Sequence, residues 1–368
     1  MHVAFITDTH FGARADSTPM MQHMAKFYDN VFFPTLEQYD VKRCIHFGDF
    51  SDRRKYINYQ TASFIHDTYR EPMVRMGIHE DVLTGNHDIY FRNSTELSGV
   101  LELYRNYRNW VHVHHHPREI DIDGCGILLL PWIADNNRDE SMQMISDSKC
   151  AIVGGHLEIA GFQMYRGVPA LEGMTARAFD RFELVVSGHF HHKSAQSPIH
   201  YLGAPYPMIW SDYDDDRGFH LFDTKTHALT FIQNPYSLFV RIVYDDANQT
   251  HDYIKDLVQG ILAKDSPHHD AYVKVVVRTK TQPYWFDLMI DALYKANAQD
   301  VLVVDDIVVN EDDDGTATAN NTPDVDTLIL MREYVQSLSI SCDKDELVKY
   351  LQTKYHEAVA STQSARLA

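Results

Sequence analysis

The sequence is short of positive charge. Its 368 residues include 33 lysines and arginines against 52 aspartates and glutamates, and the formal net charge is −19. This balance excludes a protein that holds nucleic acid through a broad basic surface, although DNA stays open as a substrate bound at one local site. It predicts weak intrinsic affinity for DNA and dependence on a partner.

Cysteines and long apolar runs are also scarce. The four cysteines are scattered without metal-type pairs, so we expect small buried side chains in a reducing cytosol. No apolar run is long enough to cross a membrane. The first residues enter a strand at once and lack the layout of a signal peptide. We therefore expect a cytoplasmic protein.

Strands and helices alternate along the first part of the chain. We expect buried strands over residues 2–7, 41–47 and 81–84, with helices over 17–39 and 58–76 between them. This order indicates parallel pairing with right-handed crossovers. From residue 110 the pattern changes to short alternating strands and hairpin turns. The sequence predicts an α/β fold, a two-sheet sandwich with helices on its outer faces.

Composition divides the chain into segments. The sandwich is expected to fill residues 1–234, and a small α+β unit to follow over 235–309. An acidic stretch without large apolar residues, 310–323, is typical of a flexible linker. Two amphipathic helices are expected over 324–359, and because a tethered amphipathic pair needs a groove elsewhere, we favour partner binding over docking onto their own domain. Residues 360–368 are expected to be a disordered tail.

Five of the expected strands end in side chains that bind metals. Open α/β sheets place their sites at the carboxyl ends of strands, so these ends are expected to converge. Carboxylates, imidazoles and one amide, without a thiolate, suit manganese, magnesium, iron or zinc at a catalytic site. The candidate residues are Asp8, His10, Asp49, Asn86, His87, His156, His189 and His191.

Two of these residues receive particular roles. Two metal ions about 3.5 to 4 Å apart need one shared carboxylate, and Asp49 is the natural bridge. His87, beside Asn86, is placed to protonate or stabilise a leaving oxygen. Taken singly, Asp8, Asp49 and Asn86 could instead be helix caps or turn residues. The five strand ends taken together favour the metal site.

The five motifs, in this order between Asp8 and His191, resemble those of the calcineurin-like metallophosphoesterase superfamily. Within it, the chain is most similar to the SbcD-type DNA repair nucleases, the family of the meiotic-recombination-eleven nuclease. The small subunits of the recombination endonucleases of T-even-like bacteriophages are the nearest group in size and layout. This resemblance implies a nuclease domain, a capping domain over 235–309, and a C-terminal helix pair that binds an SMC-like ATPase of the SbcC type.

The resemblance also implies a ligand set and an activity. It assigns Asp8, His10, Asp49 and His191 to one manganese, and Asp49, Asn86, His156 and His189 to the other, with His87 acting near the phosphate. The implied protein is a homodimeric two-manganese DNA exo- and endonuclease of a recombination and repair complex. It would dimerise through helices around residues 58–107 and cut phosphodiester bonds with a metal-activated water. Magnesium is a possible substitute for manganese.

One departure keeps alternatives open. Where cellular members carry a second catalytic histidine, this sequence has Asp52, which gives Gly48-Asp49-Phe50-Ser51-Asp52-Arg53, close to the Gly-Asp-x-x-Asp-Arg signature of protein Ser/Thr phosphatases. A phosphomonoesterase or protein phosphatase is therefore the alternative enzyme. A non-catalytic scaffold for an ATPase is the alternative outside enzymes.

Two further groups of residues have weaker signals. Arg53 and Arg54, just past the site, and Arg92, after His87, are candidate DNA contacts or ordinary solvated arginines. The tract His112, His114, His115 and His116 looks like a metal site. Because the alternation places two of these histidines on a solvated strand face, we expect only adventitious metal binding there.

Overall fold

The computed structural model of the protein describes residues 1–165, 167–305, 332, 335 and 343–351. Contacts divide the chain into a large unit, residues 1–165 with 169–309, and a second unit, residues 166–168 with 310–368. Within the described residues of the second unit, 344–351 are helical. No helix in the described part of the chain is long and apolar enough to cross a membrane.

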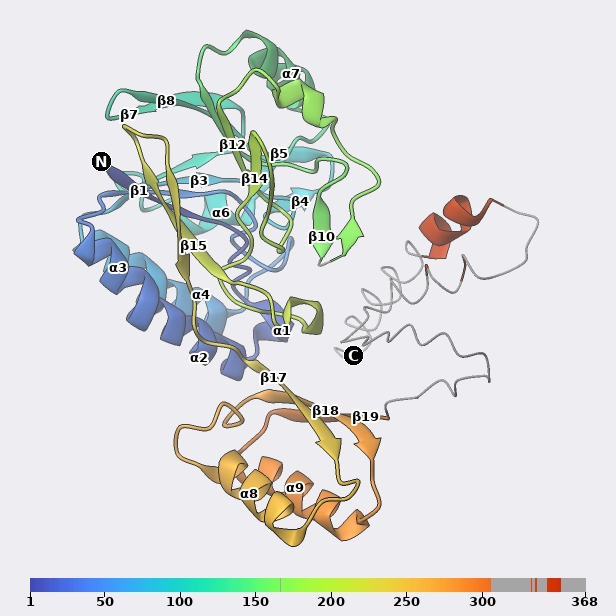
Figure 1. Cartoon of the computed structure of the whole chain (residues 1–368). Helices are drawn as coiled ribbons and strands as arrows, with labels where there is room; N and C mark the ends of the chain where they lie inside the picture. Colours follow the sequence, from blue (N-terminus) through green and yellow to red (C-terminus); the bar gives the residue numbers. More distant parts are fainter. Residues whose placement is uncertain (166, 306–331, 333–334, 336–342, 352–368) are drawn as a thin grey trace. The chain divides into compact units, whose positions relative to one another are not determined.

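The large unit contains two six-stranded sheets, and the N-terminal strands form the first (Figure 1). Its central strands pair in parallel, while the last two strands along the chain pair antiparallel at one edge. Parallel pairing follows from the helical crossovers between consecutive strands. In order across the sheet the strands are β16 (Leu229–Gln233), β15 (Gly218–Asp223), β1 (His2–Ile6), β2 (Arg43–His46), β3 (His79–Leu83) and β6 (Val111–His114).

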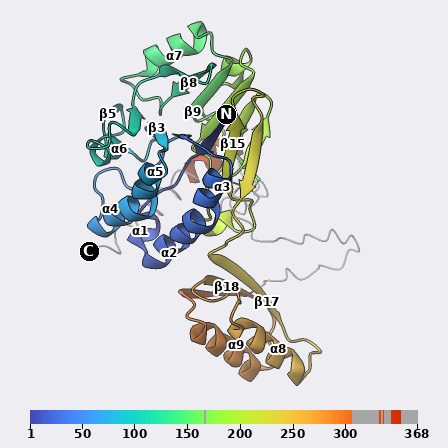
Figure 2. The same ribbon diagram turned by 90° about the vertical axis from the view of Figure 1, so that its left-hand side faces the viewer.

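Helices cover one face of the first sheet, where α2, α3 and α4 lie together (Figures 1 and 2). The two long predicted helices are each interrupted by a π-helical turn. Both turns end shortly before Pro34 or Pro72, because proline donates no N–H and its ring clashes with the preceding turn. The segments are α1 (Ala13–Asp16), α2 (Thr18–Phe27), η1 (Tyr28–Phe32), α3 (Phe33–Gln38), α4 (Tyr59–Ile65), η2 (His66–Arg70) and α5 (Glu71–Arg75).

A short hairpin and helix separate β3 from β6. They are β4 (Ile89–Phe91), β5 (Ser94–Ser98) and α6 (Gly99–Leu103), and the hairpin begins two residues after His87. The sequence analysis did not foresee this hairpin, since neither strand is longer than five residues.

The second sheet is built from the middle of the chain. Its strands β8, β9, β12 and β14 pair in parallel, with an antiparallel strand at each edge. Helix α7 (Arg138–Asp147) packs on its outer face through Ile145. Across the sheet the strands are β13 (Ser194–Gln196), β14 (Ile199–Tyr201), β12 (Leu184–Gly188), β9 (Ile152–His156), β8 (Cys125–Leu130) and β7 (Arg118–Ile122). The shorter elements in this part of the chain are β10 (Gln163–Tyr165), β11 (Val168–Pro169) and η3 (Ala176–Phe179), and η4 (Trp210–Asp212), whose Trp210 packs with the core of the first sheet.

Apolar side chains of the two sheets pack against each other. Val3 and Phe5 from β1 join Ile127 and Leu129 from β8 in one buried cluster. The alternate residues of β1, such as Ala4, face the helices instead, as the two-residue period of a strand requires. The predicted two-sheet α/β sandwich with helices on its outer faces is confirmed.

Residues 239–305 form a separate three-stranded parallel sheet with α8 and α9 on one face (Figure 1). Along the chain its elements follow one another in βαβαβ order. Arg14 connects it to the sandwich, with its guanidinium 4.0 Å from the Tyr272 ring centroid. The elements are β17 (Phe239–Asp245), α8 (His251–Leu262), β18 (Tyr272–Thr279), α9 (Pro283–Lys295) and β19 (Asp300–Asp305).

The remaining predicted segments are only partly covered by the structure. The predicted linker 310–323 and tail 360–368 lie outside the described residues. So does most of the predicted helix pair 324–359, of which 344–351 are helical. Contacts place 1–165 and 169–309 in one unit, so the predicted boundary at residue 235 stays a prediction.

One buried histidine of α2 predicts acid sensitivity. Burial, and then Lys26, lower the pKa of His23 to about 4, and its Nε2 atom has no hydrogen-bond partner. His23 therefore stays neutral in the fold, while the unfolded chain takes up a proton below about pH 6.5. Its contribution to stability is complete above that pH and falls as the pH drops toward 4, by about 3 kcal/mol in all.

Replacing His23 with leucine is expected to remove this part of the pH dependence. Urea unfolding of the variant between pH 6.5 and 4 should lose about 1.4 kcal/mol less per pH unit than wild type. The exposed His251, changed to leucine, serves as control and should leave the slope unchanged. Equal slopes for His23→Leu and wild type would contradict this assignment.

Candidate metal centre at the strand ends

The five predicted strand ends meet at one edge of the sandwich. Asp8 and His10 follow β1, Asp49 follows β2, and Asn86 with His87 follow β3 in the first sheet; His156 ends β9, and His189 with His191 follow β12 in the second. Asp8, His10, Asp49 and His189 have left-handed backbone, with φ of 52°, 41°, 51° and 87°. Non-glycine residues adopt this conformation rarely and at a cost, and it recurs at functional sites.

The first of two groups of side chains consists of Asp8, His10 and His191, here called the first cluster. Each can present one ligand atom within 4.8 Å of the others. His10 Nε2 and His191 Nε2 face each other at 3.1 Å, and the Nδ1 atom of each ring has no hydrogen-bond partner. Two imidazole nitrogens this close need a proton or a cation between them.

The second cluster consists of Asp49, Asn86, His156 and His189. His156 Nε2 lies 3.3 Å from Asp49 Oδ2 and 3.0 Å from Asn86 Oδ1, and His189 Nδ1 lies 2.9 Å from the same amide oxygen. His156 Nδ1 is 2.7 Å from the Phe47 carbonyl, to which it donates. That bond fixes the tautomer and leaves Nε2 free to act as a ligand, as in metal sites with an outer-shell carbonyl.

Asp49 lies between the two clusters. Besides His156, its Oδ2 lies 3.7 Å from His10 Nε2 of the first cluster. Burial raises the pKa of this carboxyl, but His156, His87 and His10 outweigh it and hold the pKa well below its usual range. For His156 the directions are reversed: burial lowers the pKa of the ring, but Asp49 and Asp8 outweigh burial and raise the pKa to about 9. These surroundings favour positive charge, and the donor set fits divalent cations.

His87 is held beside this carboxylate. Its backbone N–H donates to Asp49 Oδ1 at 2.7 Å, and its Nδ1 donates to the Asp52 carbonyl at 2.8 Å. Burial lowers the pKa of His87, but Asp49 and the Asp52 carbonyl raise it above the ordinary value. A protonated ring with Nε2 uncommitted is suited to proton donation. The geometry also allows His87 to join His10 and Asp49 as a ligand.

Two glycines permit the close approach of the strand ends. Gly48, at φ 96°, has no room for a Cβ, which would overlap the ring of His156. A Cβ on Gly188 would overlap Thr7 Oγ1 and the carboxylate of Asp8. Glycine at these positions lets the backbone of one sheet lie against ligands of the other.

Asp88 braces the loops that carry the ligands. Its carboxylate accepts backbone N–H groups from Phe50 at 3.2 Å, Ser51 at 3.0 Å and Gly85 at 2.9 Å. The side chain is fully buried, and burial together with Asp49 raises its pKa to about 6. Asp88 thereby ties the loop after β2 to the loop after β3.

Changing Asp88 to asparagine is expected to loosen this connection. In asparagine an NH2 group replaces one of the two acceptor oxygens. Because backbone N–H groups point at both oxygens, at least one N–H group loses its acceptor. Each unpaired buried group costs about 1–3 kcal/mol, so urea unfolding should show a loss of about 2–4 kcal/mol. Asp67→Asn, on the exposed surface, should change the free energy of unfolding by less than about 0.5 kcal/mol. Equal stability of the two variants would refute the bracing role.

The predicted DNA contacts occupy different environments. Arg53 is engaged in an ion pair with Asp16 at 2.6 Å. Burial, and then the nearby charge of Arg92, lower the pKa of Arg54, so these two arginines lie near each other. In the described part of the chain, Arg54 and Arg92 have no hydrogen bond or ion pair, which leaves both side chains available.

The histidine tract splits into two parts. His112 is exposed, as expected for a solvated strand face, but His114 is buried against Asp81 at 2.8 Å, which corrects that expectation. His115 and His116 lie beyond the end of β6.

Trp132 was missed by the sequence analysis. The centroid of the Trp132 ring lies 5.1 Å from that of His189 and 6.1 Å from that of His156. Trp132 therefore packs against the second cluster. The signal was present: Pro131 and Trp132 directly follow the buried run of β8, a parallel strand of the same sheet as β9 and β12. The strand-end rule used for the histidines applies equally to this tryptophan.

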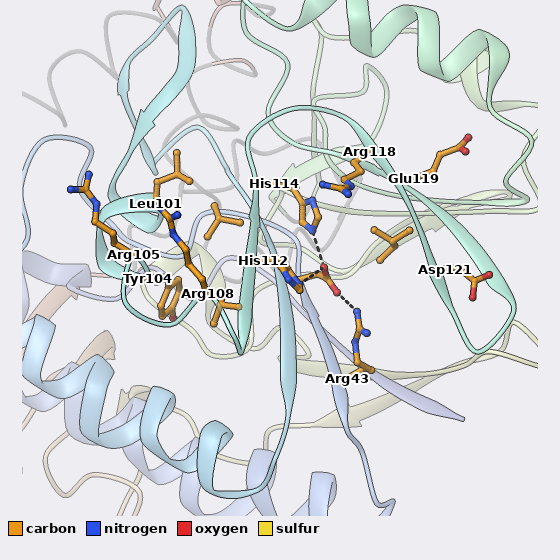
Figure 3. Close-up of a pocket in the computed structure, with 14 residues that line it drawn as sticks. Arg43, Leu101, Tyr104, Arg105, Arg108, His112, His114, Arg118, Glu119 and Asp121 are labelled. Carbon is orange, nitrogen blue, oxygen red and sulfur yellow. Dashed lines mark hydrogen bonds and ion pairs between the residues drawn. The ribbon is translucent and has the colours of Figure 1, made fainter.

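A cavity of about 540 Å³ lies elsewhere, between the edge strands β6 and β7, and contains no member of either cluster (Figure 3). Figure 3 shows Arg43, His112 and His114 among the residues that line the cavity, and all three contact Asp81, at 2.5, 4.0 and 2.8 Å. Burial raises the pKa of Asp81, but His114 and Arg43 lower it overall. This paired carboxylate accounts for the polar floor of the cavity.

The chain is similar to several known proteins and to one protein family. Exonuclease subunit 1 of Enterobacteria phage T4 is 34% identical over 200 residues, and the alignment covers 54% of this chain and 58% of the phage protein. Among solved structures, an archaeal phosphodiesterase matches with a TM-score of 0.34 and 11% identity over 64% of this chain and all of that one. Purple acid phosphatase PPD1 of yellow lupin matches with a TM-score of 0.36 and 10% identity over 63% of this chain and 52% of that one. The family model for calcineurin-like phosphoesterases matches residues 1–193, more than half of the chain. The chain therefore belongs to the calcineurin-like phosphoesterase family.

Proposed function

We propose that the protein is a two-manganese DNA nuclease, an exo- and endonuclease that hydrolyses phosphodiester bonds. The main observation behind this proposal is that Asp49 contacts His10 of the first cluster and His156 of the second. The family uses divalent metals, and the relative from phage T4 is named an exonuclease subunit. Magnesium is the substitute ion, because carboxylate and amide oxygens suit it as well.

The roles proposed for the side chains come from the family resemblance, and their contacts support them. Asp8, His10, Asp49 and His191 would hold one ion, and Asp49, Asn86, His156 and His189 the other. Bound ions of this kind polarise the phosphate and lower the pKa of an attacking water. His87, fixed by Asp49 and the Asp52 carbonyl, would donate a proton to the leaving oxygen from Nε2. Arg54 and Arg92 would contact the DNA backbone, whereas Arg53 mainly holds Asp16.

The direct test compares two substrates. Purified full-length protein with manganese should degrade linear DNA and should act on p-nitrophenyl phosphate far more slowly. Magnesium in place of manganese, and a chelator control, identify the ion. Cleavage of p-nitrophenyl phosphate alone, by the protein with or without its partner, would overturn the nuclease assignment.

A phosphomonoesterase or protein phosphatase is the second candidate, and Asp52 favours it. The Asp52 carboxylate lies 3.6 Å from His10 Nδ1, and the Asp52 carbonyl accepts a hydrogen bond from His87 Nδ1. Asp52 therefore lies within the site itself. The substrate comparison decides between the two enzymes. A non-catalytic scaffold, the third reading, predicts no hydrolysis of either substrate.

We also propose that the protein acts within a complex. An SMC-like ATPase of the SbcC type would bind residues 324–359 and supply DNA affinity that the net charge of −19 disfavours. A homodimer would form through the nuclease domain, residues 1–234, with 235–309 as a capping domain. Large apolar side chains exposed between residues 56 and 97 support an interface: Tyr56, Tyr59, Tyr90, Phe91 and Leu97. Sedimentation of the purified chain, and a nuclease assay with and without the ATPase, test both partners.

A further inference from the structure

A group of imidazoles and carboxylates lies outside both clusters, where the β4–β5 hairpin meets the end of β6. Glu96 comes from β5, and His115 and His116 follow β6. Each of the three can present one ligand atom within 4.8 Å of the others. We propose that Glu96, His115 and His116 bind a zinc ion.

The spacing of the donor atoms suits zinc. Zinc binds imidazole nitrogen and carboxylate oxygen at about 2.0–2.2 Å, so neighbouring ligands of a tetrahedral ion are about 3.3 Å apart. His116 Nε2 lies 2.8 Å from Glu96 Oε1, and His115 Nδ1 lies 3.7 Å from Glu96 Oε2. The two distances, which run to different oxygens of Glu96, lie on either side of the required one. A water molecule would complete the four ligands.

A second carboxylate orients one of the ligands. His116 Nδ1 lies 2.7 Å from Glu140 Oε2, while Nε2 faces Glu96. Metal-binding histidines characteristically donate their other ring N–H to a carboxylate, which fixes the tautomer and strengthens the ligand. Glu140 belongs to α7, so a third segment of the chain contributes to the site.

Hydrogen bonds hold the backbone of the ligands in place. The buried Thr95 donates its hydroxyl to the His115 carbonyl at 2.6 Å, and its N–H donates to Asn136 Oδ1 at 3.1 Å. Asn136 in turn donates to Thr95 Oγ1 at 3.1 Å and to Glu96 Oε1 at 3.4 Å. Glu96 and His115 are therefore positioned whether or not an ion is bound, which lowers the entropic cost of binding one.

A protonated His116 bridging Glu96 and Glu140 is the competing explanation. It uses both nitrogens of His116, and the two carboxylates raise the pKa of that ring. It leaves His115 Nδ1 without a hydrogen bond, although that atom is shielded from solvent and lies beside Glu96. A bound zinc ion, in contrast, would give both His115 and His116 a partner.

Bound zinc would hold the β4–β5 hairpin in place beside the proposed nuclease site. The β4–β5 hairpin starts two residues after His87 and carries Arg92 in its turn. Zinc would fasten this hairpin to the segment that joins β6 of the first sheet to β7 of the second. The structure thus separates His115 and His116 from His112 and His114, which the sequence grouped together as an adventitious tract.

Zinc stoichiometry tests the proposal. Full-length protein is stripped with a chelator, dialysed against zinc and assayed by elemental analysis, together with His116→Ala and a matched control from the same tract, His112→Ala. Zinc held by the strand-end clusters is common to all three proteins. His116→Ala should bind one ion fewer than wild type and His112→Ala the same number. Equal zinc in His116→Ala and wild type overturns the proposal.

Two conservative variants separate zinc binding from the salt-bridge explanation and from misfolding. Glu140→Gln keeps the fold and should weaken zinc binding about 10- to 100-fold, because it removes the carboxylate that orients His116. Glu96→Gln removes a ligand charge without changing shape and should lose the same ion as His116→Ala. An unchanged zinc affinity in Glu140→Gln, or an unchanged stoichiometry in Glu96→Gln, refutes the site.

Discussion

Asp49→Asn is expected to lower phosphodiester hydrolysis by about 10³-fold or more, because the side chain shared by the two clusters loses its charge. Asparagine is of equal size, but its amide would place a nitrogen against the His87 N–H or the ring of His156, both of which now face oxygen. The carboxyl is buried, so water cannot replace the lost charge. Manganese bound per chain should fall together with the activity.

The measurement is a DNA degradation assay in saturating manganese, paired with metal analysis of the same samples. Asp67→Asn, an exposed aspartate of η2, is the matched control and should retain both activity and metal. The shared-ligand role is wrong if Asp49→Asn keeps activity within about tenfold of wild type, because removing a charge that bridges two ions should slow hydrolysis by much more than that.

His87→Asn should show a different pattern, with kcat reduced about 10²- to 10⁴-fold while manganese binding stays at the wild-type level. The variant removes the proposed proton donor without removing a member of either cluster. The backbone N–H of residue 87, which donates to Asp49, is retained in the variant, so the loop should keep its position. A chemical step slowed without loss of metal is the signature of proton transfer rather than of ligation.

The alternative is that His87 is itself a ligand with His10 and Asp49, as their spacing allows. In that case His87→Asn would lose manganese along with activity. His192→Asn is the matched control: this ring lies next to His191 in sequence but bonds Asp215 at 2.8 Å, away from the clusters. It should leave kcat unchanged.

The strand-end pattern carried most of what was predictable about the site. Asp8, Asp49 and His156 each come at the end of a buried parallel strand, and apolar runs of this kind are easily read from sequence. Parallel strands that end at one edge must bring their following residues together, so the convergence itself was predictable. The fold class followed from the same alternation of strands and helices.

Other features depend on tertiary contacts with no local signature. The role of Asp88 arises from N–H groups of Phe50 and Ser51, which are distant in sequence. The split of the histidine tract depends on Asp81, Glu96 and Glu140, which come from three different elements.

The distribution of the two clusters over both sheets has a mechanical consequence. Asp8, His10, Asp49 and Asn86 come from the first sheet, and His156, His189 and His191 from the second, so occupied clusters would cross-link the two layers at one rim. Ion binding and the cohesion of the layers then become one equilibrium, in which each favours the other. Stripping the ions would let amide hydrogens near that rim exchange faster than those at the opposite edge. Metal supply would thus govern how long the folded protein survives as well as how fast it works.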